Sequence, residues 1–167
     1  MIAAIRTEPD RSPTTWIEDR YLHPGEIHAS AYPTRVTTIL GSCVAVCLID
    51  TQRHVAGINH YLLPHAPASS ELTSRYGDVA IDVLVLRLLA LGARREGLIA
   101  KLFGGANVLR AFADERRHIG AANVELARTM LDRHGIRIVA EHVGGTRGRK
   151  VVFSVPDGAA FIKSIGP

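Results

Sequence analysis

The sequence is poor in aromatic residues, in cysteine and in long apolar runs. Only 5% of its 167 residues are aromatic, so the core must consist mainly of Val, Leu, Ile and Ala. Two cysteines are too few for a disulfide scaffold and indicate a reducing compartment, for which the cytosol is the default. No window approaches 18 consecutive apolar residues, and the N-terminus lacks the apolar core of a signal peptide. We therefore expect a cytoplasmic protein without a membrane span.

The composition fits a single domain with a modest excess of basic over acidic residues. A hydrophobic fraction of 47% is enough to build a single buried core in a chain of this length. The formal net charge is +4 and the sequence pI is about 9.4. Such a surface is compatible with an acidic protein partner or with weak nucleic-acid contact. A solvated face explains it as well, and we expect no nucleic-acid ligand.

The pattern along the chain predicts an α/β fold. Residues 1–29 are polar and irregular, and we expect a loosely structured extension there, which forms an edge strand or drapes over the domain at 30–167. Short apolar, β-branched runs predict strands at 36–40, 44–49, 55–62, 98–103, 136–141, 150–154 and 159–165. Helices are predicted at 78–91, with Asp78 as the cap, and at 121–134. Strands that alternate with two helices indicate an α/β domain.

The segment that carries chemistry lies between the first two apolar runs. Gly41 lets the backbone bend there, and Cys43 at such a break would be held out from the sheet. Backbone N–H groups around Gly41, Ser42 and Cys43 would face a developing oxyanion. His60 follows seventeen residues later on the next predicted strand, beside Cys43 if the two strands pair. A thiol and an imidazole so placed form the couple that drives acyl transfer.

The same residues also match the spacing of a zinc site. Cys43, Cys47, His60 and His65 follow the two-cysteine, two-histidine spacing of a DNA-binding finger. Pro64 counts against this interpretation, because it separates two histidines that a finger carries on one helix. The two cysteines also lie on an apolar, strand-like run. A buried structural cysteine and a hydrogen-bonded histidine without catalytic role remain the simpler alternative at this point.

Two glycine-rich segments carry weaker signals. The segment at 104–107 is not followed by the Lys-Ser/Thr of a phosphate-binding loop. The segment at 144–150 is typical of a tight turn between strands that carries solvated charge. Neither one predicts a nucleotide or another cofactor.

Several ordered blocks of the sequence resemble the CheD family over roughly residues 20 to 160. The first is Leu40-Gly41-Ser42-Cys43-Val44-Ala45-Val46-Cys47-Leu48, followed by Gly57-Ile58-Asn59-His60 and Leu62-Leu63-Pro64. The others are Tyr76-Gly77-Asp78-Val79-Ala80, Ala100-Lys101-Leu102-Phe103-Gly104-Gly105-Ala106, Ile119-Gly120-Ala121-Ala122-Asn123-Val124-Glu125 and Gly144-Gly145-Thr146-Arg147-Gly148-Arg149-Lys150-Val151. Five ordered blocks are far more specific than any one of them.

The resemblance implies a layered α/β sandwich, related to deamidating bacterial toxins, that needs neither metal nor organic cofactor. Family members convert glutamines, and sometimes asparagines, on methyl-accepting chemotaxis receptors to the acid and ammonia. The family's catalytic cysteine, histidine and threonine fall on Cys43, His60 and Thr37. Some members bind the phosphatase CheC. A non-catalytic regulatory module for CheC or a receptor is the alternative function, and a transglutaminase outcome is a variant within the enzyme class.

Overall fold

The described part of the chain forms two five-stranded sheets and two α-helices. The computed structural model describes residues 5–6, 18–108 and 113–166, with 5–6 and 113–118 as backbone only. Sheet A contains, in spatial order, β1 (Ile5–Arg6), β10 (Ala160–Ile165), β9 (Gly148–Val155), β4 (Thr34–Leu40) and β2 (Glu18–Tyr21). Sheet B contains β3 (Ile27–Ser30), β6 (Val55–Asn59), β5 (Val44–Asp50), β7 (Ile99–Gly104) and β8 (Arg137–Val143). The helices are α1 (Gly77–Ala90), α2 (Ala113–Arg133) and the short 3₁₀ helix η1 (Arg95–Gly97).

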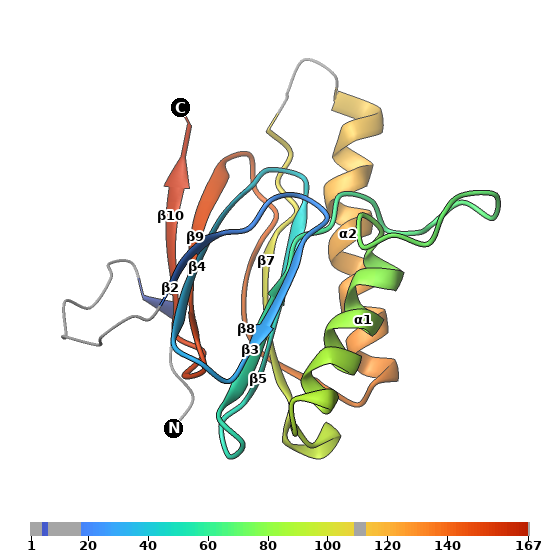
Figure 1. The fold of residues 1–167 in the computed structure, drawn as a ribbon. Helices are drawn as coiled ribbons and strands as arrows, with labels where there is room; N and C mark the ends of the chain where they lie inside the picture. The colour runs from blue at the N-terminus through green and yellow to red at the C-terminus, as the bar shows by residue number, and fades with distance from the viewer. Residues whose placement is uncertain (1–4, 7–17, 109–112, 167) are drawn as a thin grey trace.

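These elements form three layers, with sheet B in the middle (Figure 1). Sheet A covers one face of sheet B, and α1 and α2 cover the other face. One apolar cluster therefore fills the space between the sheets, and a second fills the space between sheet B and the helices. All seven residues of β5 are buried because this strand is covered on both faces. The predicted layered α/β sandwich is confirmed.

Each predicted helix and strand has a counterpart in the structure, with differences at the end of one strand and at two helix starts. The strand predicted at 55–62 ends at Asn59, and as β6 it pairs antiparallel with β5. The second helix begins by Ala113, not at 121, because its first turns are polar and lack the apolar spacing that predicts a helix. Asp78 does not cap α1. The N-cap is Tyr76, and Asp78 lies in the first turn, where its negative charge interacts favourably with the helix dipole.

The segment predicted as a loose extension is part of the sandwich where the structure describes it. β2 is an edge strand of sheet A, parallel to β4, and β3 is an edge strand of sheet B. Leu22, between them, is fully buried in the core between the sheets. Between Glu18 and Ser30 the segment therefore contributes two edge strands, one of the two forms expected for it. No such strands were predicted individually. The reason is that short edge strands with exposed polar side chains carry little apolar pattern.

Neither described helix is long and apolar enough to cross a membrane.

Candidate active site

The loop between β4 and β5 is anchored through its carbonyl groups. The C=O of Gly41 accepts the N–H of Ala106 (2.8 Å), and the C=O of Cys43 accepts the N–H of Gly105 (2.9 Å). Gly104 makes this approach possible, since a Cβ there would stand 2.1 Å from the Cys43 oxygen. Gly104 and Gly105 both have positive φ, at 111° and 68°, which glycine adopts without strain. The end of β7 thus holds the cysteine loop in place.

The N–H groups of Ser42 and Cys43 are left without such partners. Neither N–H meets an acceptor among the residues that the structure describes. The Cys43 N–H also offsets part of the rise that burial causes in the pKa of the Cys43 thiol. Two backbone donors beside a nucleophile can stabilise an oxyanion that develops there. Of the two residues predicted for this role, Ser42 keeps its N–H available, and Gly41 contributes its carbonyl to the anchoring of the loop.

The pairing of β5 with β6 continues for two residues past Asn59, and it brings Cys43 and His60 to one face. Val44 and Tyr61 exchange two backbone hydrogen bonds, of 3.1 and 3.0 Å. This register sets His60 opposite Ala45, and side chains two residues apart on a strand share a face. Cys43 and His60 are therefore diagonal neighbours on the face that looks toward sheet A. Such neighbours lie about 7–8 Å apart at Cα, within reach of an aromatic side chain.

The threonine that contacts His60 is Thr38, which corrects the prediction of Thr37. The Oγ1 of Thr38 lies 2.8 Å from the Nδ1 of His60. Thr38 is fully buried on the inner face of β4, and Thr37 points to the outer face, where it lines a surface hollow with Tyr21. The Thr37 carbonyl is also engaged, by the N–H of Leu22 (2.8 Å). Adjacent strand residues point to opposite faces, so a shift of one position exchanges core for solvent.

The hydrogen bonds of Thr38 assign the tautomer of His60. The Thr38 hydroxyl donates its one proton to the C=O of Leu22 at 2.8 Å. It can only accept from His60, so Nδ1 carries the ring proton. Nε2 is then the basic nitrogen, and it is buried without a hydrogen-bond partner among the described residues. His60 is held in the form that can accept a proton from a neighbouring thiol.

Burial keeps both members of the pair neutral. Burial lowers the pKa of His60 to about 4. The nearby Leu22 carbonyl stabilises the protonated ring and opposes part of this effect. Burial raises the pKa of the Cys43 thiol above its ordinary range. Both shifts disfavour a resting thiolate–imidazolium pair. The site therefore suits general-base activation of the thiol at the moment of attack.

Cys43 also lines a hollow of about 650 Å³ that opens to the surface. Its walls come from the cysteine loop, from the segment between β6 and α1 and from α2, and they carry apolar and polar groups. The lining residues are Ser42, Cys43, Leu62, Leu63, Ser70, Glu71, Thr73, Arg75, Tyr76 and Ile119. His60 is 2% exposed and does not line the hollow. A side chain that enters the hollow would meet the thiol before the imidazole.

The four residues with the spacing of a zinc finger do not come together in the structure. Cys47 is fully buried in the core between the sheets, and burial raises the pKa of its thiol. His65 lies at the surface, 3.5 Å from the Asp78 carboxylate. Within the described residues, no three His, Cys, Asp or Glu side chains gather in a way that could hold a metal ion.

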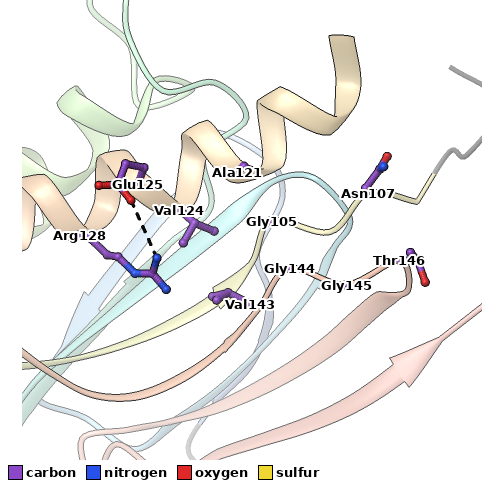
Figure 2. A pocket seen from close by; sticks show the side chains of 10 residues that line it. All are labelled: Gly105, Asn107, Ala121, Val124, Glu125, Arg128, Val143, Gly144, Gly145 and Thr146. Atoms are coloured by element: carbon purple, nitrogen blue, oxygen red, sulfur yellow. Dashed lines mark ion pairs between the residues drawn. The ribbon is translucent and has the colours of Figure 1, made fainter. Parts of the chain in front are cut away.

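A second hollow, of about 540 Å³, lies beside α2 near the ends of β7 and β8 (Figure 2). Its lining includes Gly105, Gly144 and Gly145, and Glu125 and Arg128 form an ion pair at its edge (3.9 Å). Neither Cys43 nor His60 lines it. We therefore assign the candidate chemistry to the hollow that contains Cys43.

Sequence reasoning missed two further residues of the site. Thr38 stood next to the predicted threonine and could have been selected from the alternation of β4. Asn123 of α2 is fully buried, and its side-chain amide donates to the C=O of Ser42 (3.1 Å) and of Leu62 (2.9 Å). The only signal for Asn123 was its place in one of the blocks that resemble the CheD family.

The fold and the site define a class of protein, a layered α/β sandwich with a candidate cysteine–histidine site for acyl transfer. The family model described as CheD chemotactic sensory transduction matches residues 62–164. A protein of Anaeromyxobacter dehalogenans, named probable chemoreceptor glutamine deamidase CheD 1, is 48% identical over 87% of this chain and 84% of its own length. A protein of Trichlorobacter lovleyi, named probable chemoreceptor glutamine deamidase CheD, is 41% identical over 93% of this chain and 94% of its own length. The chain belongs to the CheD family.

Proposed function

We propose that this protein is a chemoreceptor glutamine deamidase, which hydrolyses side-chain amides of receptor glutamines to glutamate and ammonia. The names of its relatives support this activity. The observation that carries the proposal is the chain of hydrogen bonds from the Leu22 carbonyl through Thr38 to His60. It leaves Nε2 as the basic nitrogen of a residue that is the diagonal neighbour of Cys43. A non-catalytic module would not need a buried histidine held in that tautomer.

In the first half of the reaction, the receptor carboxamide enters the hollow and meets Cys43. Nε2 of His60 takes the thiol proton as the sulfur bonds to the carboxamide carbon. The N–H groups of Ser42 and Cys43 stabilise the oxyanion of the tetrahedral intermediate. His60 then gives its proton to the departing nitrogen, the C–N bond breaks, and ammonia leaves behind a glutamyl thioester.

In the second half, water replaces ammonia. His60 takes a proton from the water as its oxygen bonds to the thioester carbon. The C–S bond breaks, the proton returns to the sulfur of Cys43, and glutamate is released. An amine in place of water would give a transglutamination product, which a primary amine added to the assay would reveal.

Mass spectrometry of receptor cytoplasmic fragments tests the proposal directly. Incubation with this protein is expected to convert specific glutamines to glutamates, with release of an equal amount of ammonia. The same incubation with the Cys43→Ala variant is the control. A protein that binds the fragments but leaves every glutamine intact would favour the regulatory module.

Thr38→Val is expected to lower kcat about tenfold, the effect of losing one hydrogen bond of about 1.4 kcal/mol. Valine keeps the shape of the side chain but leaves the Nδ1 proton of His60 without its acceptor. Thr37→Val, on the outer face, is the matched control and should leave kcat unchanged. Ammonia release measured for the two variants distinguishes them. Loss of activity in Thr37→Val but not in Thr38→Val would restore the original prediction.

The acid limb of the pH–rate profile is expected near pH 4. Only neutral His60 can take the thiol proton, and burial lowers its pKa to about 4. The alkaline limb should lie above the ordinary range of a cysteine, since burial raises the pKa of Cys43. Measurement of kcat/KM against pH reports both groups in the free enzyme. An acid limb at the ordinary histidine value of 6.5 would contradict a buried neutral base.

The same pKa shift makes the fold sensitive to acid. His60 binds its proton more weakly in the folded chain than in the unfolded chain. Its contribution to stability is therefore complete above pH 6.5 and is lost as the pH falls toward about 4. Circular dichroism at each pH shows whether the acid limb reflects titration of the site or unfolding.

We assign the cytoplasm as the site of action, because the predicted substrates are the cytoplasmic helices of receptors and both cysteines are free. The phosphatase CheC is the proposed regulatory partner, as the resemblance implies. Binding of purified CheC to this protein, measured in solution, tests that assignment.

A further inference from the structure

Asn123 connects α2 to both strands of the candidate site. Its Nδ2 donates one hydrogen to the C=O of Ser42, directly before the nucleophile, and the other to the C=O of Leu62, two residues after His60. Its own backbone C=O accepts the hydroxyl of Tyr61. Asn123 and Tyr61 are both fully buried. One residue of α2 therefore ties the loop of the cysteine to the strand of the histidine.

The backbone of α2 is brought to this position by a close crossing over the end of β7. A Cβ on Gly120 would stand 2.6 Å from the Gly105 oxygen, and a Cβ on Gly105 would stand 2.4 Å from Val124. Figure 2 shows Val124 of α2 beside the Gly105 segment. Since Gly120 is one helical turn before Asn123, this contact fixes the position of the Asn123 side chain. The same Gly105 donates its N–H to Cys43.

The hydrogen bond to Ser42 determines which way the next N–H points. The C=O of Ser42 and the N–H of Cys43 belong to one planar peptide group, in which they point in opposite directions. An amide that holds the Ser42 carbonyl on the α2 side therefore turns the Cys43 N–H away from α2. This N–H has no acceptor among the residues that the structure describes, so it is available to an oxyanion formed at Cys43.

We infer that Asn123 is a positioning residue for the oxyanion-binding N–H of Cys43. It touches no substrate atom in this role and acts through the peptide of Ser42 and Cys43. Its two hydrogen bonds set the angle of that peptide before substrate binds, which is the preorganisation that makes backbone donors effective in catalysis. The inference rests on the proposed role of Cys43 as nucleophile.

Two reactions of the same thiol separate this role from a merely structural one. Acylation by p-nitrophenyl acetate forms an S–C bond, passes through an oxyanion and expels p-nitrophenolate. Alkylation by iodoacetamide forms an S–C bond and expels iodide, with no oxyanion. Both reactions consume the thiol proton, which His60 accepts. The ratio of the two rates therefore isolates oxyanion stabilisation at Cys43, whatever the natural substrate is.

Asn123→Ala is expected to lower the acylation rate of Cys43 at least about tenfold, because loss of one oxyanion donor typically costs about 10²–10³ in rate. Its alkylation rate should stay close to that of the unmodified protein. In receptor deamidation, kcat should fall by a similar factor with little change in KM. Tyr61→Phe is the matched control: it removes a buried hydrogen bond to the same residue but leaves the Ser42 carbonyl held. It should lower the thermal midpoint and leave the ratio of rates unchanged.

The possible results distinguish an error in the role of Asn123 from an error in the proposed substrate. A parallel fall of acylation and alkylation in Asn123→Ala, or an equal fall of the ratio in Tyr61→Phe, would overturn the inference. Asn123→Ser, measured below its midpoint of unfolding, replaces the alanine variant if that one does not fold. If the protein shows the expected ratio but deamidates no receptor, the proposed substrate is wrong and the role of Asn123 stands. If it deamidates receptors and the ratio does not change in Asn123→Ala, the role of Asn123 is wrong alone.

Discussion

Replacing Cys43 with alanine is expected to abolish ammonia release from receptor fragments. The mechanism passes through a glutamyl thioester on this sulfur, and no other thiol can take its place. Cys47 lies on β5, which begins directly after Cys43, but it is fully buried, and burial raises the pKa of its thiol. The fold should survive, because Cys43 is only half-buried and alanine is smaller. Ammonia release and the conversion of glutamine to glutamate, both measured at matched protein concentration, check this prediction.

Cys47→Ala is the matched control for the cysteine prediction. Its side chain packs in the core between the sheets with Ile58 and Phe103. It does not line the hollow, and it forms no hydrogen bond with His60. We expect most of the turnover to remain, with some loss of stability from the deleted buried sulfur. A Cys47→Ala protein that is folded but inactive would count heavily against Cys43 as the nucleophile.

His60→Ala is expected to reduce turnover by about a hundred- to ten-thousand-fold, the usual contribution of a general base. Without Nε2, the thiol of Cys43 has no acceptor for its proton, and burial keeps that proton bound. The residual activity should depend more steeply on pH, since hydroxide or thiolate must replace the base. Initial rates of ammonia release across alkaline pH measure both effects.

His28→Ala is the control for His60→Ala, because it also replaces a buried histidine of sheet B with alanine. His28 is also buried on sheet B, and burial lowers its pKa, but it does not line the hollow and it forms no hydrogen bond with Thr38. It should lose stability and keep turnover. Equal losses of turnover in His28→Ala and His60→Ala would mean that the effect comes from a damaged core.

Much of the site follows from local pattern in the sequence. The glycine-containing break between two β-branched runs predicted where Cys43 lies, and the spacing to His60 predicted that two consecutive strands would pair. The structure confirms the pairing of β5 with β6. Consecutive strands joined by a short turn meet through contacts that are close in sequence, so their register can be expected from the chain alone.

The third residue of the site could not be taken from the same pattern. Thr37 and Thr38 are adjacent and chemically identical, and a strand presents one of them to each face. Which face is the core depends on where sheet B, Leu22 and β9 lie, and these contacts are far apart in sequence. Tertiary packing buries Thr38 and leaves Thr37 on the outer surface.

The sequence by itself predicted the thiol and the imidazole, the pairing of the strands next to them, the layered α/β class and the resemblance to the CheD family. Only the tertiary structure decided the environment of that pair: which threonine sets the tautomer of His60, how Gly104 and Gly105 hold the loop, and that Asn123, 81 residues from Ser42, reaches its carbonyl. The physical reason is that the positions of strands depend on the pattern of residues that are neighbours in the sequence. Burial, pKa and the direction of a peptide group arise from elements that meet only when the chain has folded.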